Sequence, residues 1–277
     1  MTREEKYNRF KSLHESDQAF VVPNPWDAGS ARLLTHLGFC ALATTSAGYA
    51  ISKGKRDSFA SLTRDEILKN AAEIVSATDL PVSADLEDGF GVEPEQCVET
   101  VLQASAMGLV GGCIEDATGN EEAPIHDFSL AVERVEAAAE AVKDLPFLLT
   151  ARAENFICGR PDLGDTIRRL QAFSEVGADV LYAPGLPDLD AIRTVCQSVD
   201  KPVNVVMGLS GPRYSVDELA SVGVRRISIG GSLARFAYGT IMNAAREVLD
   251  TGRFDYAERA ISNAEISQLM SQEKLMR

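Results

Sequence analysis

Carboxylate side chains directly follow two short apolar runs of the sequence. Asp85 and Glu87 come after residues 82–84, and Glu115 follows the next run along the chain. Side chains two apart in an extended chain face the same way, so Asp85 and Glu87 can point into one space. Three converging carboxylates repel one another unless they are protonated or neutralised, and oxygen ligands of this kind suit Mg²⁺ or Mn²⁺. The pattern predicts a divalent-cation site; the simpler alternative is a solvated acidic turn.

Groups that could bind an anionic substrate follow other apolar runs. Arg152 comes after residues 147–150, and its planar guanidinium can hold a carboxylate through two parallel hydrogen bonds. Ser46, Ala47 and Gly48 form a turn of small residues whose backbone N–H groups an anion can approach closely. The alternative role for Arg152 is an ion pair with Glu87 or Glu115, and both roles can hold at once. These residue types favour a small acid bound beside a cation.

Eight short apolar runs, each followed by a longer segment of helical period, must position these residues. Strands joined by helical crossovers are parallel, and eight such units fit a single (β/α)8 barrel of the TIM type. A doubly wound open sheet is the alternative. In a barrel, the site forms at the carboxyl ends of the strands. The expected strands are 19–22, 41–44, 82–84, 111–114, 147–150, 180–182, 203–206 and 226–229, and the expected helices are 28–37, 64–77, 94–107, 128–142, 163–176, 188–198, 215–222 and 232–250.

No linker rich in Pro, Gly or Ser divides the chain, so one catalytic domain is expected over residues 1–252. Residues 253–277 have a helical pattern that is only weakly amphipathic. We expect them to form a C-terminal arm that packs on a neighbouring subunit.

Composition narrows the class of partner. The formal net charge is −14, whereas nucleic acids and anionic membrane surfaces require clustered Lys and Arg. The five cysteines are scattered and show no Cys-x-x-Cys spacing, which favours a reducing cytoplasm. The charged N-terminus lacks the apolar segment of an export signal, and no run of eighteen apolar residues occurs. A cytoplasmic enzyme acting on a small molecule is expected, with no nucleic-acid or membrane partner.

The motifs together resemble the isocitrate lyase/phosphoenolpyruvate mutase superfamily, in particular its short phosphonomutase-like members. The resemblance extends from Val22 to about residue 250. It rests on Thr45-Ser46-Ala47-Gly48, Asp57, Ala84-Asp85-Leu86-Glu87-Asp88-Gly89-Phe90-Gly91, Ile114-Glu115-Asp116, Thr150-Ala151-Arg152, Leu181-Tyr182-Ala183-Pro184-Gly185 and Lys201-Pro202-Val203-Asn204.

The resemblance implies a Mg²⁺-dependent barrel of the phosphoenolpyruvate/pyruvate-binding type, which makes or breaks a C–C or P–C bond through an enolate. It implies that Asp85 is the direct metal ligand. Asp57, Glu87 and Glu115 match acids that reach the metal through water. Substrate carboxylate-binding groups are matched by Ser46, Gly48 and Arg152, and Asn204 matches a second substrate contact. Relatives commonly form tetramers, so a homo-oligomer, dimer or tetramer, is implied.

The sequence departs from the superfamily in the loop after the fourth strand. Its lyases carry Lys-Lys-Cys-Gly-His there, where the Cys acts as general acid or base, whereas residues 116–126 contain neither Cys nor Lys. The phosphonate mutases carry a gate with Lys and Asn and a His after the sixth strand, where this chain has Tyr182-Ala183-Pro184. By elimination we expect a Mg²⁺-dependent lyase or decarboxylase of a small 2-oxo or 2-hydroxy dicarboxylate similar to oxaloacetate. The alternatives are a phosphonopyruvate-type mutase or hydrolase, and a barrel that only binds a keto acid.

The sequence leaves the proton donor open. Tyr49, close to the Ser46 turn, is a candidate catalytic residue together with Asp57 and Arg152. Other candidates are Tyr182 at the end of the sixth strand, His126 in the gate loop, and Cys158, which could replace the missing gate Cys.

Overall fold

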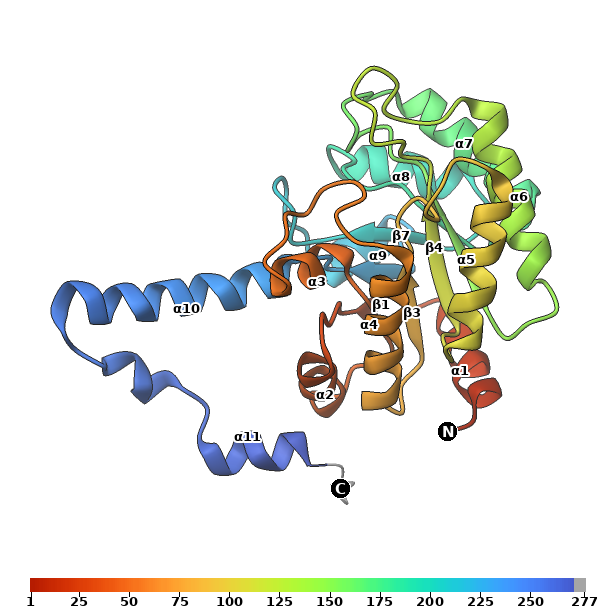
Figure 1. Cartoon of the computed structure of the whole chain (residues 1–277). Helices are drawn as coiled ribbons and strands as arrows, with labels where there is room; N and C mark the ends of the chain where they lie inside the picture. The colour runs from red at the N-terminus through yellow and green to blue at the C-terminus, as the bar shows by residue number, and fades with distance from the viewer. Residues whose placement is uncertain (272–277) are drawn as a thin grey trace.

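The computed structural model describes residues 1–271 of the 277. Eight parallel strands form one sheet in the order β1-β8-β7-β6-β5-β4-β3-β2, with helices around it (Figure 1). The strands are β1 (Phe20–Val22), β2 (Leu42–Ala43), β3 (Val82–Asp85), β4 (Gly111–Glu115), β5 (Leu148–Arg152), β6 (Val180–Tyr182), β7 (Val203–Val206) and β8 (Arg226–Ser228).

The two end strands of this order, β1 and β2, lie next to each other. The Ala43 N–H donates to the Pro23 carbonyl oxygen at 3.1 Å, and the Asn24 side-chain amide donates to the Thr44 carbonyl oxygen at 2.9 Å. These bonds bring the sheet round on itself into a nearly closed barrel. The predicted (β/α)8 barrel is therefore confirmed, and the doubly wound alternative is wrong.

Several helices start where the sequence supplies a capping side chain. Thr63 and Glu66 form reciprocal cap bonds at the start of α4, and Asp27 does the same with Ser30 at α2. The eight expected crossover and terminal helices are all present. The helices are α1 (Arg3–Glu15), α2 (Ala28–His36), α3 (Ser46–Ser52), α4 (Arg64–Ala77), α5 (Pro94–Ala106), α6 (Phe128–Val142), α7 (Leu163–Glu175), α8 (Leu189–Ser198), α9 (Val216–Ser221), α10 (Ser232–Thr251), the 3₁₀ helix η1 (Asp255–Arg259) and α11 (Asn263–Met270).

Alternate residues of each strand face different surroundings, and this alternation separates the stabilising core from the site. One set packs against the helices in a large buried cluster, with Val82, Ile114, Leu149 and Leu181 among its members. The other set faces the barrel interior. The interior set runs in register across neighbouring strands as Glu115, Arg152, Tyr182, Asn204 and Arg226.

Helix α1, which we did not expect from the sequence, lies against the amino end of the barrel. Its Phe10 is fully buried and packs with Val22, Ala43, Val110 and Leu148, among other residues of a second apolar cluster. The His14 ring meets Phe10 and Phe20 edge-to-face, with centroids 4.6 and 4.9 Å apart. The helix therefore closes the end of the barrel opposite the strands' carboxyl ends.

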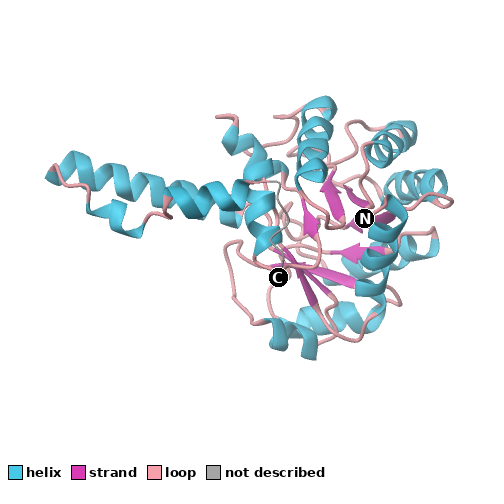
Figure 2. Ribbon diagram, turned by 90° about the horizontal axis from the view of Figure 1, so that it is seen from below, coloured by secondary structure: helices cyan, strands magenta, loops and turns pink. Residues whose placement is uncertain are grey.

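Helix α10 leaves the barrel and projects away from it (Figures 1 and 2). It ends at Gly252, which adopts the left-handed conformation, φ +67°, that favours glycine at a helix end. Helix α11 then lies near α2, where Arg32 donates to the Met270 carbonyl oxygen. Residues 272–277 of the predicted arm lie outside the described residues.

None of the helices described between residues 1 and 271 is both long and apolar enough to span a membrane.

Candidate active site

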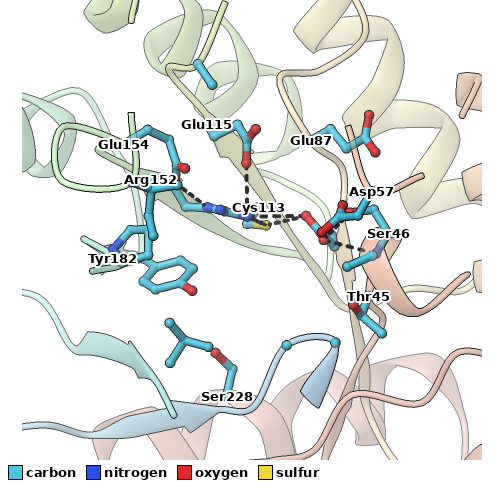
Figure 3. A pocket seen from close by; sticks show the side chains of 18 of the residues that line it. Thr45, Ser46, Asp57, Glu87, Cys113, Glu115, Arg152, Glu154, Tyr182 and Ser228 are labelled. Carbon is cyan, nitrogen blue, oxygen red and sulfur yellow. Dashed lines mark hydrogen bonds and ion pairs between the residues drawn. The ribbon is translucent and has the colours of Figure 1, made fainter. Parts of the chain in front are cut away.

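A pocket of about 550 Å³ opens at the carboxyl ends of the barrel strands. Its lining contains most of the residues that the sequence singled out. Figure 3 shows Glu115 and Glu154 beside the Arg152 side chain, with Asp57 and Glu87 farther along the pocket on the side of Ser46. The predicted site residues that line it are Ser46, Ala47, Asp57, Asp85, Glu87, Glu115, Arg152 and Asn204.

Asp85, the last residue of β3, is the most heavily bonded acid of the pocket. Its Oδ2 accepts hydrogen bonds from the Ser46 hydroxyl at 2.8 Å and from the Ser46 N–H at 3.1 Å. The Cys113 thiol donates to its Oδ1 over 3.6 Å, and the Thr44 hydroxyl accepts from its backbone N–H at 3.0 Å. Side chains of β4 and α3 therefore fix the orientation of this carboxylate.

Arg152 is surrounded by three carboxylates. Its Nη1 lies 3.0 Å from Glu115 and 3.4 Å from Asp85, and its Nε donates to Glu154 at 2.8 Å. The guanidinium also lies over the Tyr182 ring, 4.9 Å from its centroid. The ion pair with Glu115 that we considered as an alternative role is present, and the charge of Arg152 is already largely compensated.

Glu87 lies beyond the end of β3 rather than on it. Its φ of +49° places it in the left-handed region, which a residue with a side chain adopts at a cost of about 1–2 kcal/mol. Strand alternation therefore does not position it, although it lines the same pocket as Asp85. Burial, followed by the charges of Asp85, Asp88 and Asp57, raises the pKa of Glu87 to about 8.

The buried Arg134 of α6 holds the loop that contains Glu87. Only 1% of its surface is exposed, and its guanidinium donates to the carbonyl oxygens of Asp88, Gly91 and Val92. Arg134 therefore fixes the backbone of this loop through three neutral carbonyl acceptors. Arg134 is a positioning residue that the helical pattern of the sequence did not distinguish from its neighbours.

Glu115 and Asp57 also resist ionisation. Burial raises the pKa of Glu115 well above its usual value, and Glu154, Asp85 and Glu87 add to the effect, which Arg152 opposes. Burial and the charge of Asp85 raise the pKa of Asp57. Desolvation and mutual repulsion thus make it unfavourable for these acids to ionise together, and a bound cation would remove this penalty.

The arrangement of these donors fits a cation with one direct protein ligand. Among residues 1–271, no group of three His, Cys, Asp or Glu side chains is arranged to hold one ion directly. Mg²⁺ commonly keeps several of its waters and takes only one or two carboxylates. Asp85 as direct ligand, with Asp57, Glu87 and Glu115 reached through water, is compatible with this geometry.

The segment from Ser46 to Gly48 is the first turn of α3, not the isolated turn that we expected. Thr45 caps the helix by accepting a hydrogen bond from the Gly48 N–H at 3.2 Å. A Cβ at Gly48 would lie 3.2 Å from the Cβ of Ala234, so this glycine allows close packing against α10. Gly48 is not among the residues that line the pocket.

Tyr49 does not reach the pocket either. Because α3 continues through it, its side chain is buried in the core between the barrel and its helices, with 7% of its surface exposed. The prediction that Tyr49 is catalytic is therefore not supported by its position. Of the other candidate proton donors, Tyr182 and Cys158 line the pocket, whereas His126 lines a neighbouring pocket.

The environments of these three candidates differ. Burial raises the pKa values of Tyr182 and of Cys158, the latter to about 11, so both carry their proton at neutral pH. Burial and the charges of Arg134 and Arg169 lower the pKa of His126 to about 4. Tyr182 and Cys158 are thus protonated groups at the pocket wall, as a proton donor requires.

Two loops border the mouth of the pocket. Phe59, from the loop between α3 and α4, lies against Gly119 of the loop after β4, where a Cβ would come within 2.2 Å of the Phe59 ring. Gly119 has a φ of +70°, so glycine is required there both by conformation and by space. The loop after β4, which lacks the superfamily's Cys and lysines, thus contributes a contact surface for Phe59.

The pocket residues that were not singled out from the sequence include Cys113, Glu154 and Arg226. Each follows from period-two alternation, since Cys113 lies two before Glu115, Glu154 two after Arg152, and Arg226 two before Ser228. The alternation was used only for Asp85 and Glu87. Applied to every strand, it would have identified all three.

Comparison with known proteins gives the family. Residues 10–249 match the sequence profile described as phosphoenolpyruvate phosphomutase. A Burkholderia cenocepacia protein described only as a lyase or mutase shares 50% identity, covers 97% of this chain and 96% of its own, and superposes with a TM-score of 0.94.

Two curated relatives have named activities. The 2-methylisocitrate lyase of Bacillus subtilis is 25% identical, over 82% of this chain and 76% of its own. The oxaloacetate decarboxylase of Pseudomonas entomophila is 26% identical, over 82% of this chain and 79% of its own. The resemblance found in the motifs is confirmed by these matches. This chain belongs to the phosphoenolpyruvate phosphomutase family, within the isocitrate lyase/phosphoenolpyruvate mutase superfamily of lyases and phosphomutases.

Proposed function

We propose that this protein is a Mg²⁺-dependent lyase or decarboxylase of a small 2-oxo or 2-hydroxy dicarboxylate similar to oxaloacetate. The observation that carries the proposal is the cluster of Asp57, Asp85, Glu87 and Glu115 around one pocket at the carboxyl ends of the strands. Burial raises the pKa of three of these acids. A cluster of this kind is costly without a compensating cation, so it supports a cation-dependent activity. Mn²⁺ is the other ion that such oxygen ligands suit.

Asp85 would hold the cation directly, with the other three acids around its water ligands. When bound, such a cation supplies Lewis-acid stabilisation of the negative charge that develops on the substrate's keto oxygen in an enolate. Ser46 would hold Asp85 in place through the two hydrogen bonds described above. This arrangement agrees with an acidic barrel that accepts an anionic substrate.

Arg152 and Tyr182 would act on the substrate itself. Glu154 fixes the Nε edge of the Arg152 guanidinium, which leaves its Nη groups for a carboxylate once Asp85 and Glu115 serve the cation. Tyr182 lines the pocket beneath this guanidinium and is protonated at neutral pH, so it can donate a proton to the carbon left by the cleaved bond. We propose Tyr182 as the proton donor in place of Tyr49.

A mutase or hydrolase of a phosphonopyruvate-type substrate is the second candidate. The profile match to a family named for phosphoenolpyruvate phosphomutase favours it. The absence of a Lys from residues 116–126 and of a His from Tyr182-Ala183-Pro184 disfavours it. The absence of the gate Cys motivates a third candidate, a barrel that only binds a keto acid.

A substrate panel separates these three candidates. Oxaloacetate, 2-methylisocitrate, 2,3-dimethylmalate and phosphonopyruvate are each incubated with Mg²⁺, with Mn²⁺ and with chelator, and the products are identified. We expect cleavage of a dicarboxylate that chelator abolishes and that Asp85→Ala lowers by about 100-fold or more, from several kcal/mol of lost stabilisation. The exposed Asp144→Ala is the matched control.

The outcomes distinguish the candidates. Rearrangement or hydrolysis of phosphonopyruvate alone would establish the second candidate. Metal-dependent binding of oxalate without turnover of any substrate would establish the third. Turnover that neither chelator nor Asp85→Ala affects would refute the cation site.

We further propose a cytoplasmic homo-oligomer, a dimer or tetramer in which residues 253–277 pack on a neighbouring subunit. The described part of this segment and the projecting α10 expose large apolar side chains that a monomer would leave in water. They are Phe236, Ile241, Met242, Leu249, Phe254 and Ile261. All five cysteines are free, as a reducing compartment would keep them.

A further inference from the structure

Arg226 is a buried cation on the floor of the pocket. It is the first residue of β8, only 4% of its surface is exposed, and it contributes to the pocket lining. Its Nη1 donates to the Thr150 hydroxyl at 3.1 Å. Thr150 precedes Arg152 by two residues on β5, a backbone rise of about 7 Å, so the Arg226 guanidinium bonds to the interior layer below the one that contains Arg152.

The hydrogen-bond partners of Arg226 are neutral. Its Nε donates to the Asn204 amide oxygen at 2.9 Å, and Asn204 in turn donates to the Ser228 hydroxyl at 3.1 Å. No carboxylate among residues 1–271 forms an ion pair with Arg226. These bonds use two of the five N–H groups of its guanidinium and fix the remaining ones in a rigid plane.

Of the two pocket arginines, Arg152 and Arg226, only Arg226 lacks a carboxylate counterion. Arg152 has three carboxylates within 3.4 Å, whereas Arg226 has none. Burial lowers the pKa of Arg226 to about 10, which leaves it charged at neutral pH. A buried charge without a partner is costly, so an anion that reaches Arg226 supplies the counterion that this guanidinium lacks.

We infer that Arg226, held in place by Asn204 and Thr150, is the second anion-binding group of the pocket and takes the distal carboxylate of a dicarboxylic substrate. The inference rests on the proposed function, which places the other end of the substrate beside Asp85 and Arg152. The two anion-binding positions, one beside Asp85 and Arg152 and one at Arg226, lie at different depths of one pocket. The pocket therefore selects small molecules that carry two anionic groups. Monocarboxylic 2-oxo and 2-hydroxy acids would occupy only the position beside Asp85 and Arg152.

The test compares two stable 2-hydroxy acids of similar size. Malate carries the distal carboxylate, and 2-hydroxy-4-methylpentanoate carries an isopropyl group in its place. Their dissociation constants are measured by calorimetry in the presence of Mg²⁺ for the wild type, Arg226→Met and Arg226→Lys. Arg225→Met is the matched control, because this neighbouring arginine pairs only distantly with the exposed Asp17, at 3.9 Å.

We expect Arg226→Met to weaken malate binding by about 30-fold or more, the effect of removing one partner of a buried charged pair. Binding of 2-hydroxy-4-methylpentanoate should stay unchanged or improve, and Arg226→Lys should retain part of the preference for malate. A wild type that does not prefer malate, or an Arg226→Met variant that keeps the preference, would overturn the inference.

Oxalate separates failure of this inference from failure of the proposed function. Oxalate is too short to reach both anion-binding positions, so its binding should depend on Mg²⁺ and Asp85 but not on Arg226. Intact oxalate binding by Arg226→Met also shows that the variant is folded. Loss of malate preference with intact, Mg²⁺-dependent oxalate binding therefore bears on Arg226 alone.

Discussion

Replacing Glu87 by glutamine is expected to stabilise the metal-free protein at alkaline pH. Folding raises the pKa of this carboxyl from 4.5 to about 8, first through burial and then through Asp85, Asp88 and Asp57. The folded chain therefore binds one more proton than the unfolded chain between these two values. Its stability falls as the pH rises through that window and stays low above it.

The structure bounds the size of the effect. Each pH unit between the two values corresponds to about 1.4 kcal/mol, so the full window gives at most about 5 kcal/mol. Glu87 is partly exposed, and solvent screening reduces the expected gain to about 2–4 kcal/mol. Glutamine adopts the left-handed backbone at the same cost as glutamate, so strain cancels in the comparison.

Urea unfolding in the presence of chelator measures this difference. At pH 9 Glu87→Gln should be more stable than the wild type by the amount above, and at pH 5 the two should be nearly equal. Glu133→Gln, at an exposed position of α6, is the control and should change little at either pH. Equal stability of Glu87→Gln and wild type at pH 9 would show that burial and the neighbouring acids do not raise the pKa of Glu87 as argued.

Two further predictions concern positions outside the acidic cluster. Arg134→Met should lower the free energy of unfolding by about 3–5 kcal/mol and also reduce kcat/KM, because three loop carbonyls lose their donor. Urea unfolding measures the first effect and steady-state kinetics the second. Unchanged kinetics would show that the position of the Glu87 loop does not depend on Arg134. Truncation after Thr251 should reduce the oligomer to a smaller species in sedimentation analysis, and an unchanged mass would exclude the arm as an interface.

The barrel itself could be predicted because its signals are local. Helices begin at side chains that cap them, such as Asp27, Thr63 and Ser215, and each strand is a short apolar run. The acids at the strand ends were therefore placed correctly around one pocket. Glu87 was grouped correctly but for the wrong reason, because a left-handed residue and not strand alternation positions it.

Features that depend on tertiary packing were missed. Thr45 is a helix cap, and reading it as such would have extended a helix through Tyr49 and removed that residue from the candidate list. Helix α1 has a mostly polar sequence, and only Phe10 and His14 are buried in it, so its contact with the barrel has little sequence signal. Arg226 was taken for the start of a strand, and its lack of a counterion is visible only once its neighbours are known.

The closure of the barrel by α1 has a consequence for turnover. Phe10 and His14 leave the pocket without a rear exit, so both products of a cleavage must leave through the mouth bordered by Phe59 and Gly119. In a C–C cleavage whose distal product keeps its carboxylate, the fragment nearer the mouth departs first and the fragment held at the floor by Arg226 departs last; in a decarboxylation the distal carboxylate leaves as neutral CO2, which Arg226 does not hold. Product inhibition should therefore be competitive with substrate for the fragment held at Arg226 and noncompetitive for the fragment nearer the mouth. Steady-state kinetics alone would then show in which direction the substrate binds.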